Sequence, residues 1–218
     1  MRALAFLPCL LGCGSAAEPD EAPGTGADEL ACGAPAARYA SEVVAVQYGP
    51  GQAFGRDRMP AVVLGPPHGA GCCAGSLDVV SLGNGGAITV GFGPSAIADG
   101  PGPDFIVFEN AFYVGGDPDA PFAELATVEV SADGTTWTAF PCTATAPPYG
   151  TCAGWHPVYQ DGDGSPLEPE AAGGDAFDLA TVGLPLVRYV RMTDRADLDG
   201  PQGVFDLDAV GIVNPVCP

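Results

Sequence analysis

Short segments in which apolar and polar residues alternate, with turn residues between them, run through most of the chain. In LATVEVS, residues 125–131, the side chains of Ala126, Val128 and Val130 fall on one side of a strand and polar ones on the other. TTWTAF follows at 135–140 after an Asp-Gly step, which supplies the positive φ angles that a tight hairpin needs. The pattern predicts an antiparallel β-hairpin.

The same alternation predicts a second hairpin, in which LDVVSL at 77–82 and AITVGF at 87–92 flank Gly83-Asn84-Gly85-Gly86. The 32 glycines and 23 prolines argue against helices, because both residues interrupt them. Eight or nine strands without a convincing helix predict an all-β fold, an antiparallel β-sandwich. The remaining strand candidates are EVVAVQY from 42, AVVL from 61, DFIVFENAF from 104, LVRYVRM from 186 and VFDLDAVGIV from 204.

Acidic residues interrupt the apolar rows of two of these strands. In 105–111, every second side chain points the same way, so that Glu109 falls in one row with Phe105 and Val107. Asp206 and Asp208 share a face of the last strand, alongside apolar residues further on. A buried, unpaired carboxylate costs several kcal/mol or becomes protonated, so these residues need a partner.

The charge of the chain is strongly one-sided. Its 218 residues carry seven basic side chains, all arginine, against 27 acidic ones, for a formal net charge of −20 at pH 7. Nucleic acid is not expected as a partner, because binding it requires clusters of Lys or Arg and the longest basic cluster is Arg56-Asp57-Arg58. The acidity supports solubility and also suits cation binding.

The first residues predict export. MRALAFLPCLLGC has one positive charge at Arg2, an apolar run and a small residue before Cys13, which is the layout of a signal peptide over residues 1–12. Leu10-Leu11-Gly12-Cys13 resembles a bacterial lipobox, which implies lipidation of Cys13 and an outer-membrane or cell-surface location; an ordinary secretory signal is the alternative. Residues 13–31 predict an acidic, flexible tether, and 32–218 a single domain.

Cysteines support export, because the domain keeps an even number of them, as disulfide-bonded exported proteins do. The pair Cys142–Cys152 flanks a Pro-rich loop and is the first predicted disulfide. A pair Cys32–Cys217 would staple the two ends of the domain. Cys72 and Cys73 would then form a vicinal bridge or cross-pair with the ends.

Three segments in order, VEVSADGTTWTAF, VRYVRMTD and FDLDAVGIV, resemble the later half of a discoidin-like, galactose-binding-like domain. This resemblance covers residues 125–213 and implies a jelly roll, often with a structural Ca²⁺. A longer set, SLGNGGAITVGF, GPGPDFIVFENAF and FDLDAVG, resembles a group of uncharacterised exported bacterial surface proteins over residues 77–213. Residues 141–175 form an insertion with its own cysteine pair.

A calcium ion would balance the negative charge of the acidic residues in these strands. Ca²⁺ takes about six to eight oxygen ligands from carboxylates, amides and backbone carbonyls. The alternative is that Arg188 or Arg191 pairs with the acids, or that they cap backbone amides. The predicted metal ligands are Asp104, Glu109, Asn110, Asp206 and Asp208.

Several aromatic and imidazole side chains lie close together in the sequence of the insertion. Exposed rings on a loop of a rigid sandwich stack on sugars or dock proteins, so these residues are the predicted ligand-binding surface. The alternative for Trp155 is that it folds back over the edge of the sandwich. The predicted ligand-binding residues are Tyr149, Trp155, His156 and Tyr159.

No catalytic constellation stands out. Only His68 and His156 can serve as imidazole bases, and no serine lies in a G-x-S-x-G elbow. The sequence therefore predicts a non-catalytic, monomeric surface lipoprotein whose calcium-stabilised domain binds an extracellular glycan or protein, and which meets the membrane only through its lipid. The alternatives are a structural or accessory envelope protein without a small ligand, and a glycoside hydrolase that uses two carboxylates.

Overall fold

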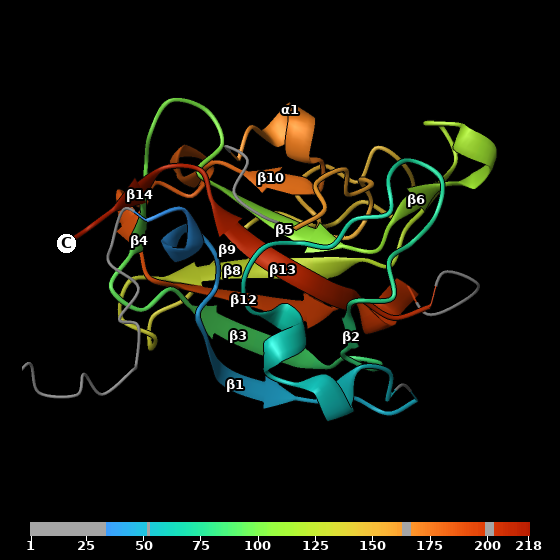
Figure 1. Cartoon of the computed structure of the whole chain (residues 1–218), viewed down its shortest axis with the longest axis horizontal. Coiled ribbons are helices and arrows are strands. Elements are labelled where there is room, and N and C mark those ends of the chain that lie inside the picture. The colour runs from blue at the N-terminus through green and yellow to red at the C-terminus, as the bar shows by residue number, and fades with distance from the viewer. Residues whose placement is uncertain (1–33, 52, 163–166, 199–202) are drawn as a thin grey trace, which may run out of the picture.

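The computed structural model describes residues 34–51, 53–162, 167–198 and 203–218, and its main strands form two packed sheets (Figure 1). These ranges contain fourteen strands, more than the eight or nine expected, because several strands have only two or three residues. The predicted signal peptide, Cys13, the tether and Cys32 lie outside the described residues.

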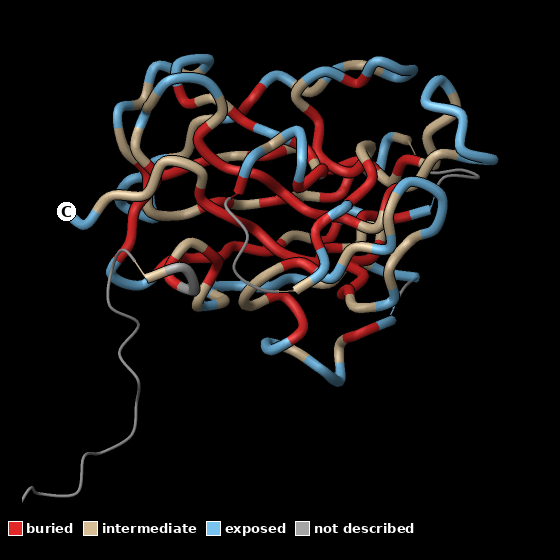
Figure 2. Tube along the Cα trace, turned by 45° about the horizontal axis from the view of Figure 1, so that its top comes forward, coloured by how far each residue is buried: buried red, intermediate tan, exposed pale blue. Residues whose placement is uncertain are grey.

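The two sheets form an antiparallel β-sandwich. Buried residues from both sheets meet in one core, and Figure 2 shows the buried positions concentrated along the central strands. The five-stranded sheet has the order β1 (Glu42–Gln47), β3 (Ala87–Gly91), β12 (Tyr189–Asp194), β8 (Ala126–Ser131) and β9 (Thr138–Ala139). The four-stranded sheet has the order β10 (Asp175–Phe177), β5 (Phe105–Glu109), β13 (Asp206–Ile212) and β2 (Val80–Ser81).

Short elements extend the ends of the sandwich. The predicted strand AVVL is wrong, because residues 61–63 form a 3₁₀ helix. This helix still buries Val62 and Val63, and a short apolar run in a sequence does not distinguish a buried helix from a buried strand.

Two small sheets complete the strands. One contains β11 (Leu186–Val187), β4 (Ala96–Ala98) and β14 (Pro215–Val216), and the other pairs β6 (Phe112–Tyr113) with β7 (Pro121–Phe122). The helices are α1 (Pro169–Ala172) and the 3₁₀ helices η1 (Pro35–Arg38), η2 (Arg56–Arg58), η3 (Ala61–Val63), η4 (Val114–Gly116), η5 (Leu179–Thr181) and η6 (Ala196–Leu198).

One predicted hairpin is confirmed and the other is wrong. β8 and β9 pair antiparallel, and in the turn Asp133 Oδ1 accepts the backbone N–H groups of Thr135 and Thr136 at 2.8 and 2.7 Å. β2 and β3 lie in different sheets, so the Gly-rich turn 83–86 carries the chain from one sheet to the other. The alternation of apolar and polar residues predicts which side chains are buried, but it does not predict which strand pairs with which.

Both faces of β5 are buried, as its apolar residues predict. Phe105 and Val107 belong to the core between the sheets. Ile106 and Phe108 belong to a second cluster on the outer face, where they pack with residues of the N-terminal segment and of the insertion. The insertion, with α1, therefore covers the four-stranded sheet from outside (Figure 1).

A β-bulge interrupts β13 at Asp208. Leu207 lies opposite Glu109 and Ala209 lies opposite Phe108, which leaves Asp208 without a partner in β5. Because an extra residue shifts the alternation, Leu207 faces the core together with residues 210 and 212. The expectation that Asp206 and Asp208 share a row with those two apolar residues is therefore wrong.

The structure confirms one predicted disulfide and shows which of the two alternatives for Cys72 and Cys73 is formed. Cys142 is bonded to Cys152 across the Pro-rich loop, and Cys72 is bonded to its neighbour Cys73. Cys217 is also disulfide-bonded, and its predicted partner, Cys32, lies outside the described residues.

Candidate functional site

Glu109 ends β5 with a carboxylate that is buried in the sandwich. The residue is 1% exposed and continues the inward row of Phe105 and Val107. Neither Oε1 nor Oε2 has a hydrogen-bond partner in the described part of the chain. Burial raises the pKa of Glu109 well above its usual range, and the carboxylates of Glu124 and Asp206 raise it further.

Two more carboxylates lie at this end of β5. Glu124, which precedes β8, has its pKa raised to about 8 by burial and by the charges of Asp206 and Asp194. Burial raises the pKa of Asp206, the first residue of β13, to about 6. Asn110 Nδ2 donates to Asp206 Oδ2 at 3.5 Å, and Oδ1 has no partner among the described residues. We refer to Glu109, Glu124 and Asp206 as the acidic triad.

The structure brings together three of the five predicted metal ligands, Glu109, Asn110 and Asp206. Asp104 lies at the other end of β5, just before its first residue. Asp208, in the bulge, accepts the backbone N–H of His68 with both carboxylate oxygens, at 2.9 and 3.2 Å. Sequence reasoning missed Glu124, because this residue falls between two strands and interrupts no apolar row.

A second group of acids surrounds Asp104. One oxygen each from Asp99, Asp104 and Asp178 lie within 4.8 Å of one another. Asp104 already accepts three hydrogen bonds, from the backbone N–H groups of Gly100 and Leu179 and from the Asn214 amide, at 2.7–2.8 Å. Protein hydrogen-bond donors therefore satisfy both oxygens of this carboxylate.

Arginine does not compensate the acidic triad. Arg191, one of the expected partners, donates through Nε to Glu129 Oε2 at 2.8 Å, and its guanidinium lies 4.1 Å from the centre of the Trp137 ring. Arg188 donates its backbone N–H to Ser131 O. Within the described chain, no basic side chain is among the groups that shift the pKa values of the triad.

Asp208 makes folding stability depend on pH. Burial raises its pKa to about 8, and the charges of Asp78 and Asp161 act against the lowering effect of the His68 N–H. A carboxyl whose pKa is higher in the folded than in the unfolded chain binds its proton more tightly when folded. The free energy of unfolding therefore falls as the pH rises between about 4 and 8.

Asp208→Asn removes this titrating group and is expected to reduce the fall in the free energy of unfolding by up to about 1.4 kcal/mol per pH unit. Urea unfolding at pH 5, 6.5 and 8 measures the effect.

Asp161→Asn is the matched control for that measurement. The Asp161 side chain is 74% exposed and contacts the imidazole of His68, with Oδ1 3.2 Å from Nδ1, whereas Asp208 accepts the backbone N–H of that residue. Its removal should leave most of the slope in place. Equal slopes for the wild type and Asp208→Asn would show that the bulge carboxyl does not titrate in this range.

A cavity of about 320 Å³ opens beside β10 and β6. Two tyrosines and a histidine contribute rings to its lining, Glu170 contributes a carboxylate, and two glycines belong to the lining as well. We call this cavity the aromatic pocket; its lining residues are Tyr113, His156, Pro157, Tyr159, Pro169, Glu170, Gly173, Gly174 and Ala176.

The imidazole of His156 is held in place by Asp175. This carboxylate is the first residue of β10, and its side chain is only 4% exposed. Its Oδ2 accepts the backbone N–H groups of Gly154 and Trp155 at 2.6 and 3.1 Å, and its Oδ1 lies 2.7 Å from His156 Nδ1. In a neutral imidazole, Nδ1 then donates to Asp175 and Nε2 is left as an acceptor.

Of the four predicted ligand-binding residues, His156 and Tyr159 line the aromatic pocket and the other two do not. Tyr149 is 3% exposed and packs edge-on against Trp155, with 5.8 Å between ring centres, in a cluster that contains Cys152. Trp155 Nε1 donates to Cys152 O at 3.1 Å. These two rings therefore pack within the insertion around the disulfide. Sequence reasoning missed Tyr113, which lies outside the insertion.

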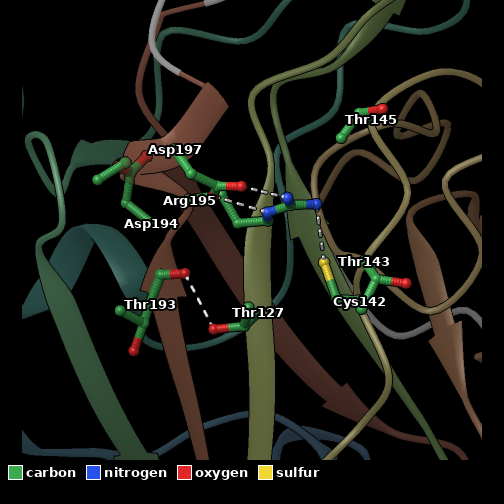
Figure 3. A pocket seen from close by; sticks show the side chains of 9 residues that line it. Thr127, Cys142, Thr143, Thr145, Thr193, Asp194, Arg195 and Asp197 are labelled. Carbon is green, nitrogen blue, oxygen red and sulfur yellow. Dashed lines mark hydrogen bonds and ion pairs between the residues drawn. The ribbon is translucent and has the colours of Figure 1, made fainter.

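A larger cleft of about 610 Å³ lies along β8 and β12 (Figure 3). Its surface is rich in threonine, and Thr127 Oγ1 donates to Thr193 O at 3.3 Å. Arg195 is the basic residue of its lining. The Nε and Nη2 atoms of this side chain donate to Asp197, and Nη1 donates to Ala144 O at 2.7 Å. Because these interactions engage the guanidinium, the cleft offers hydroxyl groups and no free positive charge to a ligand.

Comparison with known proteins gives no match: neither a protein-family model nor a curated protein is similar to this chain. The resemblance to discoidin-like domains therefore remains a prediction. In the part of the chain that the structure describes, no helix combines the length and the apolar character that crossing a membrane requires.

Proposed function

We propose that this protein is a non-catalytic, exported binding domain that recognises a neutral carbohydrate in the aromatic pocket. The observation that carries the proposal is the pocket itself, which combines exposed rings with a buried Asp175 that orients His156. The predicted lipid on Cys13 would place this domain at the cell surface, where polysaccharides are accessible.

The lining of the pocket suits a sugar. Tyr159 is 46% exposed and Tyr113 is partly exposed, so two ring faces are available for the C–H surface of a pyranose. His156 Nε2 and the Glu170 carboxylate can accept hydrogen bonds from sugar hydroxyls. A cavity of about 320 Å³ with few polar groups falls in the size range of small-molecule sites and accommodates one or two sugar rings.

The pocket is fixed before a ligand binds. Gly174 has a φ of 73°, and a Cβ there would lie 2.7 Å from the Phe108 ring, so the floor sits directly on the outer face of β5. At Gly173 a Cβ would lie 2.1 Å from Pro157 O. Because the floor packs on a buried strand and the histidine is hydrogen-bonded, binding would order few side chains and would lose little entropy.

The charge of the chain selects among glycans. A formal net charge of −20, together with Glu170 in the wall of the pocket, repels sulfated and uronic-acid sugars. Neutral hexose and N-acetylhexosamine polymers are therefore the expected ligand class.

Tyr159→Ala is expected to weaken glycan binding about tenfold or more, because it removes one stacking ring, worth about 0.5–1.5 kcal/mol beyond its buried area. Binding of the full chain to an array of neutral and acidic oligosaccharides, followed by calorimetric titration of the ligands found, measures the effect. Phe54→Ala is the matched control, because Phe54 is also 46% exposed and lies outside the pocket lining.

Two outcomes of this experiment contradict the proposal. A wild-type protein that binds no glycan on the array would favour the structural envelope role without a small ligand. Glycan binding that survives Tyr159→Ala and His156→Ala would place the binding site elsewhere, with the threonine-rich cleft as the next surface to test.

A further inference from the structure

A disulfide between two adjacent residues lies in the loop that precedes β2. Cys72 and Cys73 are bonded to each other, and both residues are exposed. The other disulfide whose two cysteines the structure describes, Cys142–Cys152, differs, because Cys152 is fully buried in the cluster that contains Trp155. A thiol reagent therefore reaches the sulfurs of the adjacent pair more easily.

The loop with this disulfide is hydrogen-bonded to the residues on both sides of Tyr159. The backbone N–H of Gly69 donates to Gln160 O at 2.8 Å. The backbone N–H of Gly71 donates to Val158 O at 3.0 Å. A Cβ at Gly69 would lie only 2.3 Å from Val158 O, so the two segments are in close contact. The position of Tyr159 therefore depends on this loop.

The same loop also holds Tyr113, the other tyrosine of the aromatic pocket. Cys72 O accepts the backbone N–H of Tyr113 at 2.7 Å. A Cβ on Gly116, in η4, would lie 3.5 Å from Cys73 Sγ, which places this sulfur against the turn that follows Tyr113. Because Tyr113 and Tyr159 both line the pocket, the loop determines how far apart their rings lie.

The disulfide restricts the carbonyl group that accepts the Tyr113 N–H. Because the two cysteines are adjacent, their S–S bond closes a small ring that runs through the peptide bond between them. The carbonyl carbon of Cys72 is a member of this ring. Torsions within a closed ring have fewer accessible conformations than those of an open chain. Opening the ring therefore frees this carbonyl to turn away from Tyr113.

We propose that Cys72–Cys73 is a thiol–disulfide exchange site through which an external dithiol weakens ligand binding in the aromatic pocket. A thiolate of the dithiol attacks one sulfur of the pair, the S–S bond breaks, and a mixed disulfide forms. The second thiolate of the dithiol then attacks its own sulfur in the mixed disulfide and releases the protein. Two electrons and two protons pass to the cysteines, and the dithiol becomes a disulfide. This control rests on the proposed function, because it acts on the pocket in which we propose that a glycan binds.

Reduction of the full chain with increasing concentrations of dithiothreitol tests the proposal. Alkylation and mass spectrometry identify the free cysteines, and hydrogen exchange reports on the Tyr113 N–H. Free thiols at Cys72 and Cys73 should appear while Cys142–Cys152 is still bonded. Exchange of the Tyr113 N–H should then accelerate about five- to tenfold, as expected for the loss of one backbone hydrogen bond, and glycan affinity should fall by a similar factor.

A double variant, Cys72→Ser with Cys73→Ser, separates this disulfide from the others. Its Tyr113 N–H should exchange as fast as in the reduced wild type, and dithiothreitol should have no further effect. The variant retains Cys217, which is also disulfide-bonded, so a remaining response would come from another disulfide. If the variant does not fold, reoxidation of the reduced wild type replaces it and should restore slow exchange.

Three results would overturn the proposal. The adjacent pair could open only together with Cys142–Cys152, reduction could leave the Tyr113 exchange unchanged, or glycan affinity could stay constant while this exchange accelerates. A wild type that binds no glycan in either state would instead contradict the proposed function. The alkylation pattern and the exchange of the Tyr113 N–H do not require a glycan, and they would still decide whether the disulfide controls the pocket.

Discussion

Phe105→Ala is expected to lower the free energy of unfolding by about 3–5 kcal/mol, the usual cost of removing a phenyl ring from a core. Phe105 is fully buried and stacks on Phe177, with 5.0 Å between ring centres and an angle of 11° between planes. Phe140 packs edge-on against both rings. This cluster of three rings joins β10 and β5 to the residue that follows β9. The neighbouring side chains therefore cannot fill the cavity left by Phe105→Ala unless strands of both sheets move.

Urea unfolding, monitored by far-UV circular dichroism, measures this loss. Phe105→Leu is the control, because it keeps most of the apolar volume and should cost less than half as much. A loss below about 1 kcal/mol for alanine would mean that the three rings do not form a close-packed core.

Asp104→Ala is expected to destabilise the protein by about 2–4 kcal/mol, although it removes only a small polar group. The carboxylate accepts N–H groups of Gly100 and Leu179 and the amide of Asn214, and the Leu179 bond is fully buried. Each buried donor left without a partner costs about 1–3 kcal/mol. Asp104 thereby connects the start of β5 to the first residue of η5 and to the turn after β13.

The conservative variant separates hydrogen bonding from charge. Asp104→Asn keeps one acceptor oxygen and should lose about half as much stability as alanine in the same urea experiment. Equal stability of the wild type and Asp104→Ala would contradict the assignment of these three bonds as structural.

The sequence predicted individual strands better than their neighbours. Alternation in 105–109 correctly assigned Phe105 and Val107 to one buried face and Ile106 and Phe108 to the other. The Asp-Gly turn correctly joined β8 to β9, since the local turn geometry there also determines the partner. The turn at 83–86 has similar residues, but tertiary packing sends β2 and β3 into different sheets.

The candidate sites were only partly predictable for the same reason. Glu109 stood out because it interrupts an apolar row, and the structure places it inside the core without a partner. Glu124 and Tyr113 join their sites through loops, and no local pattern marks them. The bulge at Asp208 places Val210 and Ile212 in the core with Leu207, and not in one row with Asp206 and Asp208, because an inserted residue reverses the facing of the residues that follow it.

The position of β13 in its sheet determines when the chain can fold. This strand lies between β5 and β2 in the four-stranded sheet, although in the sequence it comes after both of them. β12, in the middle of the other sheet, also comes late and pairs with β3, about a hundred residues earlier. Neither sheet can be completed until residues 189–212 have been synthesised. Such long-range pairings slow folding, so the strands that precede β12 and β13 lack these neighbours until residues 189–212 have been made.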